Sequence, residues 1–260
     1  MISSKNDTDI ENLRQAGKIS KEVLDIALCS CKIGITTLQL DSLINSEIIN
    51  RKATPWFKEV NNYNYSSCIS VNEVWLHGIP SSYTLKRNDV VKIDLGIKYN
   101  GMHVDNCYAI VVQEDMTNVN VRDCFAHDDK KVTKFLSDGI RILYSAINEA
   151  KVGGRVGDIS FAMGYLSNKD GYSVIDGYVG HGIGYKNWED PQIPCFGVKG
   201  AGALIKKNYV FAIELMYTMG AKDFIIGDDG FSVISKDKKT TSMFEHTVLV
   251  TENGPEILTL

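Results

Sequence analysis

Acidic residues recur inside apolar, strand-like segments of this sequence, and their types and spacing could support chemistry. Asp94 lies in VVKIDLGI, Glu214 in YVFAIELMY and Glu245 in SMFEHTVLVT. Such segments are typical of sheet interiors, where an unpartnered ionised carboxylate costs many kcal/mol. Each acid taken singly could be a solvated or hydrogen-bonded strand residue. Taken together, the acids predict bound divalent cations, because Lys and Arg are scarce around these segments.

A fourth acid, Asp105, is placed by a hairpin signal. Asn100-Gly101 is the dipeptide most typical of a two-residue β-turn. With this turn, Asp105 lies opposite Gly96, and Asp94 projects from the same face two residues earlier along its strand. The two Cβ atoms would then be about 7 to 8 Å apart on a diagonal, so both carboxylates can bind one cation.

Two histidines stand beside glycines and complete the candidate set. His181 lies within GHGIG, where glycines let the backbone pack closely, and it is the best imidazole candidate for a metal ligand. His77 lies in a similar segment, HGIP. The alternatives are a turn residue for His181 and a structural hydrogen bond for His77. A mostly oxygen donor set with one imidazole suits Mn, Fe, Co or Zn, and the sequence leaves the choice open.

The elements that must position these residues follow an order that occurs twice. Two helices are predicted before each of two strand-rich segments, 67–112 and the stretch after residue 166. In the first pair, Thr8 and Glu11 form a possible capping box. The predicted helices run from Thr8 to Gly34, from Thr37 to Arg51, from Val132 to Gly153 and from Ile159 to Leu166.

Two local matches favour an internal duplication. Lys-Ile-Gly at 32–34 is matched by Lys-Val-Gly at 151–153, and VVKIDL at 90–95 is matched by VFAIEL at 210–215. The second match puts an acid at the same position of each half. We therefore expect one domain over residues 1–260 with two pseudo-symmetric halves, 1–112 and 132–260, joined by a polar connector at 113–131.

Composition and charge narrow the class of protein further. The chain has 260 residues, a formal net charge of −4 and no basic excess, so neither a nucleic acid nor an anionic membrane is an expected partner. We find neither a leader-like apolar segment nor an apolar run of about 18 residues. The six cysteines fit no zinc ribbon and no dense disulfide scaffold. The cytoplasm is the expected location.

Several motifs occur in the order and near the spacings of one known family. They are CISVNEVWLHGIP (68–80), VVKIDLGIKYNGMHVDN (90–106), GHGIG followed by EDP (180–191), FAIELM (211–216) and FEHTVLVTENGPEILTL (244–260). On these residues the sequence resembles the type I methionine aminopeptidases of peptidase family M24. The resemblance spans nearly the whole chain. It implies the α+β pita-bread fold, an antiparallel sheet covered by helices.

The resemblance also implies a site with two divalent metal ions. Asp105 and Glu245 would bridge both ions, Asp94 would complete one, and His181 with Glu214 would complete the other. A metal-activated bridging water would attack the peptide, with Glu214 accepting its proton. His77 would donate a hydrogen bond near the scissile peptide, as an imidazole titrating near working pH.

The sequence departs from the family pattern at the substrate side of the site. Trp188 stands where the family carries a second histidine that helps to hold the substrate carbonyl. Tyr63, Cys68 and Phe231 fall where the family lines its methionine pocket. Phe57 and Val60 occupy pocket positions that usually look different, and preference for methionine is therefore a weaker expectation than peptidase chemistry.

Three hypotheses about function follow. The first is an active aminopeptidase that removes the N-terminal residue, initiator methionine foremost, from peptides and nascent chains, including chains at the ribosome, and that acts as a monomer. The second is a related enzyme, either an aminopeptidase with altered first-residue preference or a dipeptidase-like relative. The third is a catalytically impaired binding module in which Trp188 closes the substrate side.

Overall fold

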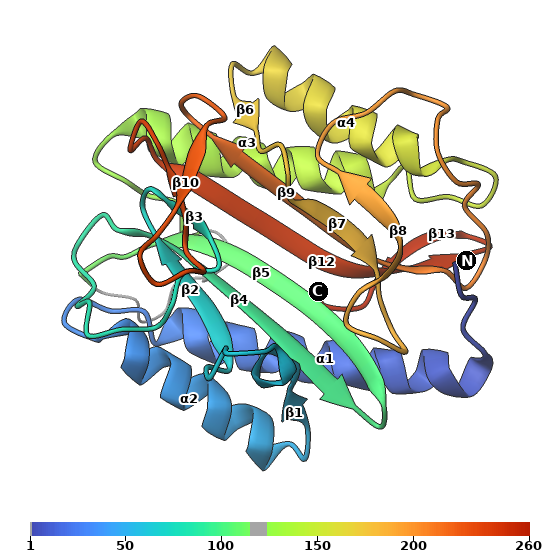
Figure 1. The fold of residues 1–260 in the computed structure, drawn as a ribbon, viewed down its shortest axis with the longest axis horizontal. Coiled ribbons are helices and arrows are strands. Elements are labelled where there is room, and N and C mark those ends of the chain that lie inside the picture. The colour runs from blue at the N-terminus through green and yellow to red at the C-terminus, as the bar shows by residue number, and fades with distance from the viewer. Residues whose placement is uncertain (1, 115–123) are drawn as a thin grey trace.

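The computed structural model describes residues 2–114 and 124–260. Figure 1 shows long strands that run side by side, with helices along both sides of them in this view. Part of the predicted connector, 115–123, lies outside the described residues. The helices are α1 (Asp7–Cys29), α2 (Thr37–Asn50), the 3₁₀ helix η1 (Trp56–Glu59), α3 (Lys130–Ile147) and α4 (Val156–Lys169). The strands are β1 (Thr54–Pro55), β2 (Ser67–Val71), β3 (Val74–Leu76), β4 (Val90–Tyr99), β5 (Met102–Val111), β6 (Ser173–Val174), β7 (Val179–Gly182), β8 (Glu189–Pro194), β9 (Val210–Thr218), β10 (Phe224–Ile226), β11 (Val233–Ser235), β12 (Thr241–Thr251) and β13 (Gly254–Ile257).

The main sheet is antiparallel and joins strands that are distant in the chain. Its order is β1-β4-β5-β12-β9-β7-β8, with β2 paired to β4, β6 to β9 and β13 to β12. The last long strand, β12, therefore lies between β5 of the first half and β9 of the second. A small three-stranded sheet, β10-β11-β3, stands apart from it.

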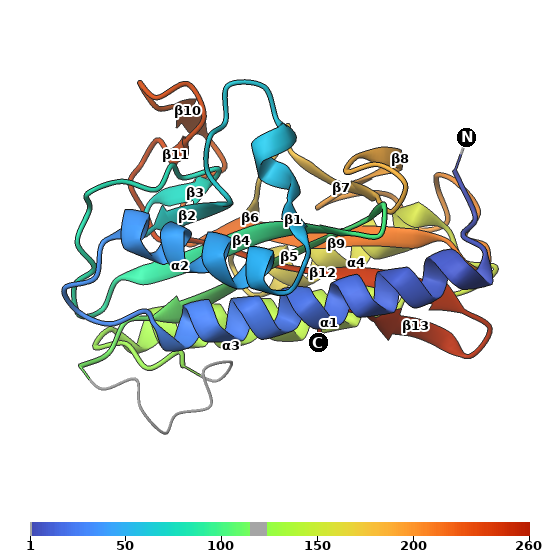
Figure 2. The same cartoon turned by 90° about the horizontal axis from the view of Figure 1, so that it is seen from below.

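The long helices cover one face of this sheet. Figure 2 shows α1 and α3 along that face, with η1, β8 and the β10–β11 hairpin on the opposite side. Helix α1 contacts β4 and β5, and α3 contacts β9 and β12. Leu13, Leu24, Phe135 and Leu143 are fully buried on the helix side. The core on that side leaves the opposite face of the sheet free to carry a site.

The predicted helices are correct in place, but the boundaries of the first, third and fourth are wrong. Helix α4 covers Val156–Lys169 and is longer at both ends than the predicted segment from Ile159 to Leu166. Helix α1 starts after Asn6, whose side chain accepts a hydrogen bond from the backbone N–H of Asp9, so the predicted capping box of Thr8 and Glu11 is not used. The helix ends at Cys29, before the predicted end at Gly34. A residue with a good capping side chain two positions earlier is sufficient to move the start.

The second helix agrees closely with its prediction. It covers Thr37–Asn50, and a capping box of Thr36 and Gln39 satisfies its first backbone N–H groups. The third helix ends at Ile147, six residues before the predicted stop at Gly153. Gly34 and Gly153, which were predicted to end the two long helices, lie in the connections that follow α1 and α3, and both have positive φ. Glycine therefore indicated the connection after each helix and not the last helical residue.

The hairpin register is confirmed. Asn100 and Gly101 both have positive φ, 46° and 82°, as a type I′ turn requires. Gly96 pairs with Asp105, and Asp94 pairs with Cys107. The two aspartates consequently share one face of the sheet, the face opposite the long helices.

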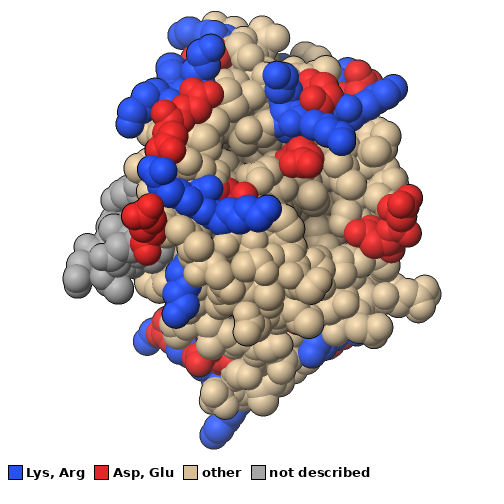
Figure 3. Space-filling model, turned by 90° about the vertical axis from the view of Figure 1, so that its left-hand side faces the viewer, with Lys and Arg blue, Asp and Glu red and all other residues tan. Residues whose placement is uncertain are grey.

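The two halves show the same order of elements, two helices followed by a long strand that carries an acid. Their origin by duplication stays a prediction. Among the helices in residues 2–114 and 124–260, none combines the length and apolar character needed to span a bilayer. Figure 3 shows basic and acidic side chains mixed over one face of the molecule.

Candidate metal centre and pocket

A row of four residues crosses the centre of the main sheet. Asp94 of β4 pairs with Cys107 of β5, Cys107 with Glu245 of β12, and Glu245 with Glu214 of β9. Directly paired residues in an antiparallel sheet point to the same face, so three acids and a thiol share it. Asp105, two residues before Cys107, projects there too. The strand order therefore gathers four acids that are up to 151 residues apart in the chain.

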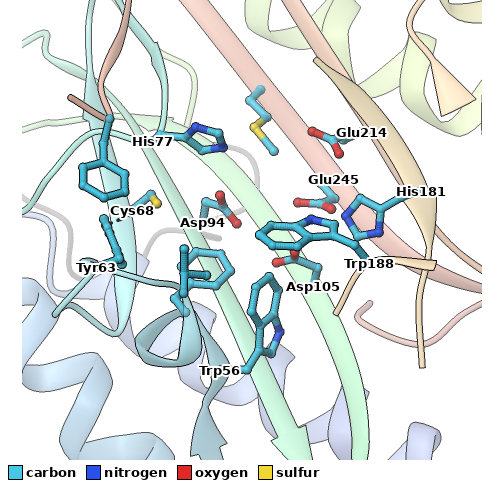
Figure 4. A pocket seen from close by; sticks show the side chains of 14 residues that line it. Trp56, Tyr63, Cys68, His77, Asp94, Asp105, His181, Trp188, Glu214 and Glu245 are labelled. Atoms are coloured by element: carbon cyan, nitrogen blue, oxygen red, sulfur yellow. Dashed lines mark hydrogen bonds between the residues drawn. The ribbon is translucent and has the colours of Figure 1, made fainter. Parts of the chain in front are cut away.

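Three of these acids form a tight cluster. Carboxylate oxygens of Asp94, Asp105 and Glu245 lie within 4.8 Å of one another, and all three residues are buried. Figure 4 shows the four carboxylates around a common space, with His77 and His181 on opposite sides. Oδ1 of Asp94 and Oε2 of Glu245 are buried and accept no hydrogen bond from any residue that the structure describes. Two orphaned anionic oxygens in one cluster are the feature that a bound cation would satisfy.

The electrostatics of the cluster agree with this interpretation. Burial raises the pKa of Asp94 to about 7, an effect that its hydrogen bond with Asp105 opposes. Burial first, and then the neighbouring acids, raise the pKa of Asp105, Glu214 and Glu245 well above the ordinary range of carboxyl groups. The protein by itself therefore disfavours four ionised carboxylates here. Divalent ions reverse that preference, because they interact only with the ionised form.

The predicted imidazole ligand lies at the same site. His181 of β7 pairs with Ala212, two residues from Glu214, so its side chain reaches the face that carries the acids. Its Nδ1 is 2.8 Å from the carbonyl oxygen of Gly182. If Nδ1 carries the proton, Nε2 is left as a lone-pair donor toward the pocket. Burial lowers the pKa of His181 to about 4, so the ring is neutral at pH 7 and suited to bind a metal.

His77 lies on the other side of the acids. Its φ of 56° is a left-handed backbone conformation that few non-glycine residues adopt, and it turns the side chain into the pocket. The ring packs edge-on against Tyr178, with centroids 5.4 Å apart. Burial lowers the pKa of His77 to about 4. The expectation of titration near working pH is therefore wrong for the metal-free protein, because a dry setting disfavours the imidazolium.

An apolar compartment adjoins the acids. Tyr63, Cys68 and Phe231 all line the same pocket as the acids and both histidines. The Tyr63 hydroxyl donates to the carbonyl of Ser67 at 2.7 Å and lies 3.2 Å from Sγ of Cys68, while its ring packs against Phe231 at 5.3 Å. These contacts form an apolar side of the pocket next to the acids.

The structure also brings two residues to the pocket that the sequence did not single out. Met243 and Trp56 line it, Trp56 from η1. The indole N–H of Trp56 donates to the carbonyl of Val104 at 3.0 Å, and its ring lies over Gly96, where a Cβ would be 2.1 Å from it. A glycine inside a long strand was the available signal, because it marks a close approach by another group.

Trp188 stands at the rim. It lines the pocket but is 55% exposed, and its ring contacts Trp56 at 5.7 Å and His181 at 6.3 Å between centroids. All ten residues predicted for the site thus line one pocket. Their individual roles as ligands, catalytic groups or substrate contacts stay predictions.

Fold and site together define a metal-dependent hydrolase of the pita-bread class. A family model described as Metallopeptidase family M24 matches residues 11–252. The chain belongs to metallopeptidase family M24, and the predicted family and fold are confirmed. Similar full-length proteins include a methionine aminopeptidase of Clostridium perfringens, 37% identical over 260 residues that cover 100% of this chain and 99% of the relative. Methionine aminopeptidase 1 of Bacillus subtilis is 37% identical over 259 residues, with coverage of 100% and 99%.

Solved structures agree with the sequence comparison. A methionine aminopeptidase from Thermotoga maritima superimposes with a TM-score of 0.92 at 33% identity, covering 100% of this chain and 99% of that one. A prolidase from Pyrococcus furiosus has a TM-score of 0.77 at 21% identity, and only 65% of its chain is covered. The second likeness is one of fold alone.

Proposed function

We propose that this protein is a metal-dependent aminopeptidase that removes the N-terminal residue, methionine foremost, from peptides and proteins. The observation that carries the proposal is the pocket, in which buried, orphaned carboxylates lie beside an apolar compartment closed by Tyr63, Cys68 and Phe231. The predicted enzyme class is confirmed, because relatives of full length at 34–37% identity carry the name methionine aminopeptidase.

The donor set fits two divalent cations. Asp94, Asp105, His181, Glu214 and Glu245 would hold them, a mainly oxygen set with one imidazole that suits Mn, Fe, Co or Zn. When bound, such ions make water a nucleophile at neutral pH and polarise the peptide carbonyl. Four carboxylates balance the charge of two divalent ions, which is why we propose two and not one.

The protein's own groups supply positioning and proton transfer. Glu214 accepts the proton of the attacking water, since its carboxylate faces the acid cluster from β9, where Glu214 pairs with Glu245. His77, neutral at pH 7, donates a hydrogen bond from its N–H to the substrate carbonyl. The apolar compartment binds the side chain of the first residue. Trp188 lines the side of the pocket along which the rest of the bound peptide extends.

A second candidate, a binding module without catalysis, rests on Trp188 at the place of the family's second histidine. The comparisons give it no support over the peptidase. The pocket also argues against it, because Trp188 is 55% exposed and the four acids and both histidines still line a pocket together with it.

The finer predictions about partners and place follow from the same picture. We propose that nascent chains at the ribosome are among the substrates. We also propose that the enzyme acts as a monomer, because the ten predicted site residues of one chain already line a common pocket. None of the six cysteines, all of which the structure describes, forms a disulfide, and five of them are buried, which favours the reducing cytoplasm as the location.

Hydrolysis of Met-Ala-Ser tests the proposed function. Protein stripped with a chelator and reloaded with Co or Mn is expected to release free methionine, as measured by mass spectrometry. Glu245→Gln, which keeps the size of a proposed ligand and removes its charge, is expected to lose the activity. Absence of turnover with every first-row divalent metal would contradict the proposal.

A further inference from the structure

The segment that carries Trp188 is a loop between β7 and β8. On the pocket side, the Trp188 ring packs edge-on against Trp56 and His181, and its backbone N–H donates to the side chain of its own neighbour, Asn187. Trp188 is 55% exposed, so these contacts cover only part of the residue. The position of Trp188 must depend on what holds the loop from behind.

The N-terminal segment lies behind that loop. Nζ of Lys5 donates to Oε2 of Glu189 at 2.7 Å, and Glu189 is the residue directly after Trp188. The other carboxylate oxygen of Glu189 accepts the backbone N–H of Lys186 at 3.0 Å, which closes the loop on itself. The same Lys5 ammonium lies 4.3 Å above the ring of Tyr185. One cation thus contacts the loop on both sides of Trp188.

Lys5 is buried, and its backbone is hydrogen-bonded to the rest of the fold. Its side chain is 1% exposed and that of Glu189 is 11% exposed, whereas most ion pairs of the described residues lie at the surface. Its backbone N–H donates to the carbonyl of Asn208 at 2.9 Å, and Nδ2 of Asn208 donates back to the carbonyl of Lys5 at 3.1 Å. An ion pair this protected from water is weakened little by salt and restricts both partners.

Gly184 of the loop leaves space for the side chain of Lys5. Gly184 has a φ of 137°, and a Cβ at that position would lie 2.3 Å from Cε of Lys5. The carbonyl of Gly184 accepts the backbone N–H of His103 at 2.7 Å, which joins the loop to β5. The lysine stem therefore crosses the loop at a residue without a side chain, and Figure 1 shows the N-terminal segment on the same side of the molecule as β7 and β8.

We propose that Lys5 is a positioning residue that holds Trp188 at the rim of the pocket, so that the N-terminal segment sets the shape of the substrate site. Lys5 touches neither the acids nor the apolar compartment and acts through Glu189 and Tyr185 on the loop. The consequence for substrate rests on the proposed function. A Trp188 side chain that is already held in place loses less conformational entropy when a peptide binds. Loss of Lys5 is therefore expected to raise KM and to leave the chemical step unchanged.

Lys5→Met tests the inference, because methionine keeps the apolar stem and removes the ammonium. We expect KM for Met-Ala-Ser to rise about threefold to tenfold, the range set by one ordered side chain, with kcat within about twofold of the wild type. Acrylamide quenching of tryptophan fluorescence is expected to increase. Trp56 and Trp75 are 1% and 0% exposed, so quenching reports mainly on Trp188.

A double-variant comparison separates positioning from general loss of stability. In a Trp188→Ala background, Lys5→Met is expected to change neither KM nor quenching, because the residue through which it acts is gone. Lys21→Met, which removes a surface ion pair with Asp25, is the matched control and is expected to leave both unchanged. Equal effects of Lys5→Met in both backgrounds, or unchanged quenching in the single variant, would overturn the inference.

Two further arms keep the test decisive. If Lys5→Met does not fold, Glu189→Gln breaks the same ion pair with the lysine stem in place, and the same results are expected of it. If the wild type cleaves no peptide, the proposed function fails, while the quenching comparison still decides whether Lys5 holds Trp188.

Discussion

Replacing Asp94 with Asn separates a metal-binding acid from a structural one, because the two roles predict opposite changes in stability. Burial raises the pKa of Asp94 from 3.8 to about 7. The folded metal-free protein therefore binds more protons than the unfolded chain between those values, and its free energy of unfolding falls as pH rises through that window. The loss is complete above about pH 7.

The size of the effect follows from the same pKa. At about 1.4 kcal/mol per pKa unit, the difference corresponds to about 4 kcal/mol. Asparagine is neutral at every pH and avoids this loss. Metal-free Asp94→Asn is thus expected to be more stable than the wild type at pH 8, by up to about 4 kcal/mol, and of similar stability at pH 4. A chain of this size gains roughly 2–4 °C in Tm per kcal/mol.

Metal stabilises the wild type more than the variant and so offsets most of this difference. A ligand at 100 times its Kd stabilises the folded state by about 2.7 kcal/mol, and Asp94→Asn loses a proposed ligand. The test compares the Tm of wild type and variant by calorimetry at pH 4 and at pH 8. Each pH is measured first with a chelator and then with Mn. Asp25→Asn, at a partly exposed helix position paired with Lys21, is the control and is expected to show neither effect. A metal-free variant less stable than the wild type at pH 8, or equal stabilisation of both by Mn, would refute the reasoning.

Three further changes probe the framework and the pocket. Gly96→Ala places a Cβ 2.1 Å from the Trp56 ring, so it is expected to lower the free energy of unfolding by about 1–3 kcal/mol, as measured by urea denaturation. A change below about 0.5 kcal/mol would contradict the close packing. His77→Ala is expected to lower kcat about 10²- to 10⁴-fold with calorimetric metal binding intact, and an unchanged kcat would remove His77 from the mechanism. Phe231→Ala opens the apolar compartment, so kcat/KM for Met-Ala-Ser is expected to fall about tenfold while that for Ala-Ala-Ser changes little, and an equal loss for both peptides would place the side-chain pocket elsewhere.

Local signals in the sequence predicted the local geometry well. The Asn100-Gly101 turn fixed the register of its hairpin, because only a few turn types join two strands through two residues. Once the register was known, the shared face of Asp94 and Asp105 followed from the two-residue period of a strand. Helix interiors were found from apolar periodicity, while the ends of the first helix were wrong, since capping depends on single side chains such as Asn6.

The convergence of the site was decided by pairings between distant segments. Nothing local to β12 requires that it lie between β5 and β9, yet this order is what brings Glu245 beside Asp105 and Glu214. The resemblance to a family supplied that arrangement as an expectation, whereas the residue pattern supplied only the acids. Contacts of Trp56 with Gly96 and of Lys5 with Glu189 were likewise invisible, since each joins segments 40 or more residues apart. A chain encodes such contacts only through the packing of the whole fold, because no short-range spacing rule connects their partners.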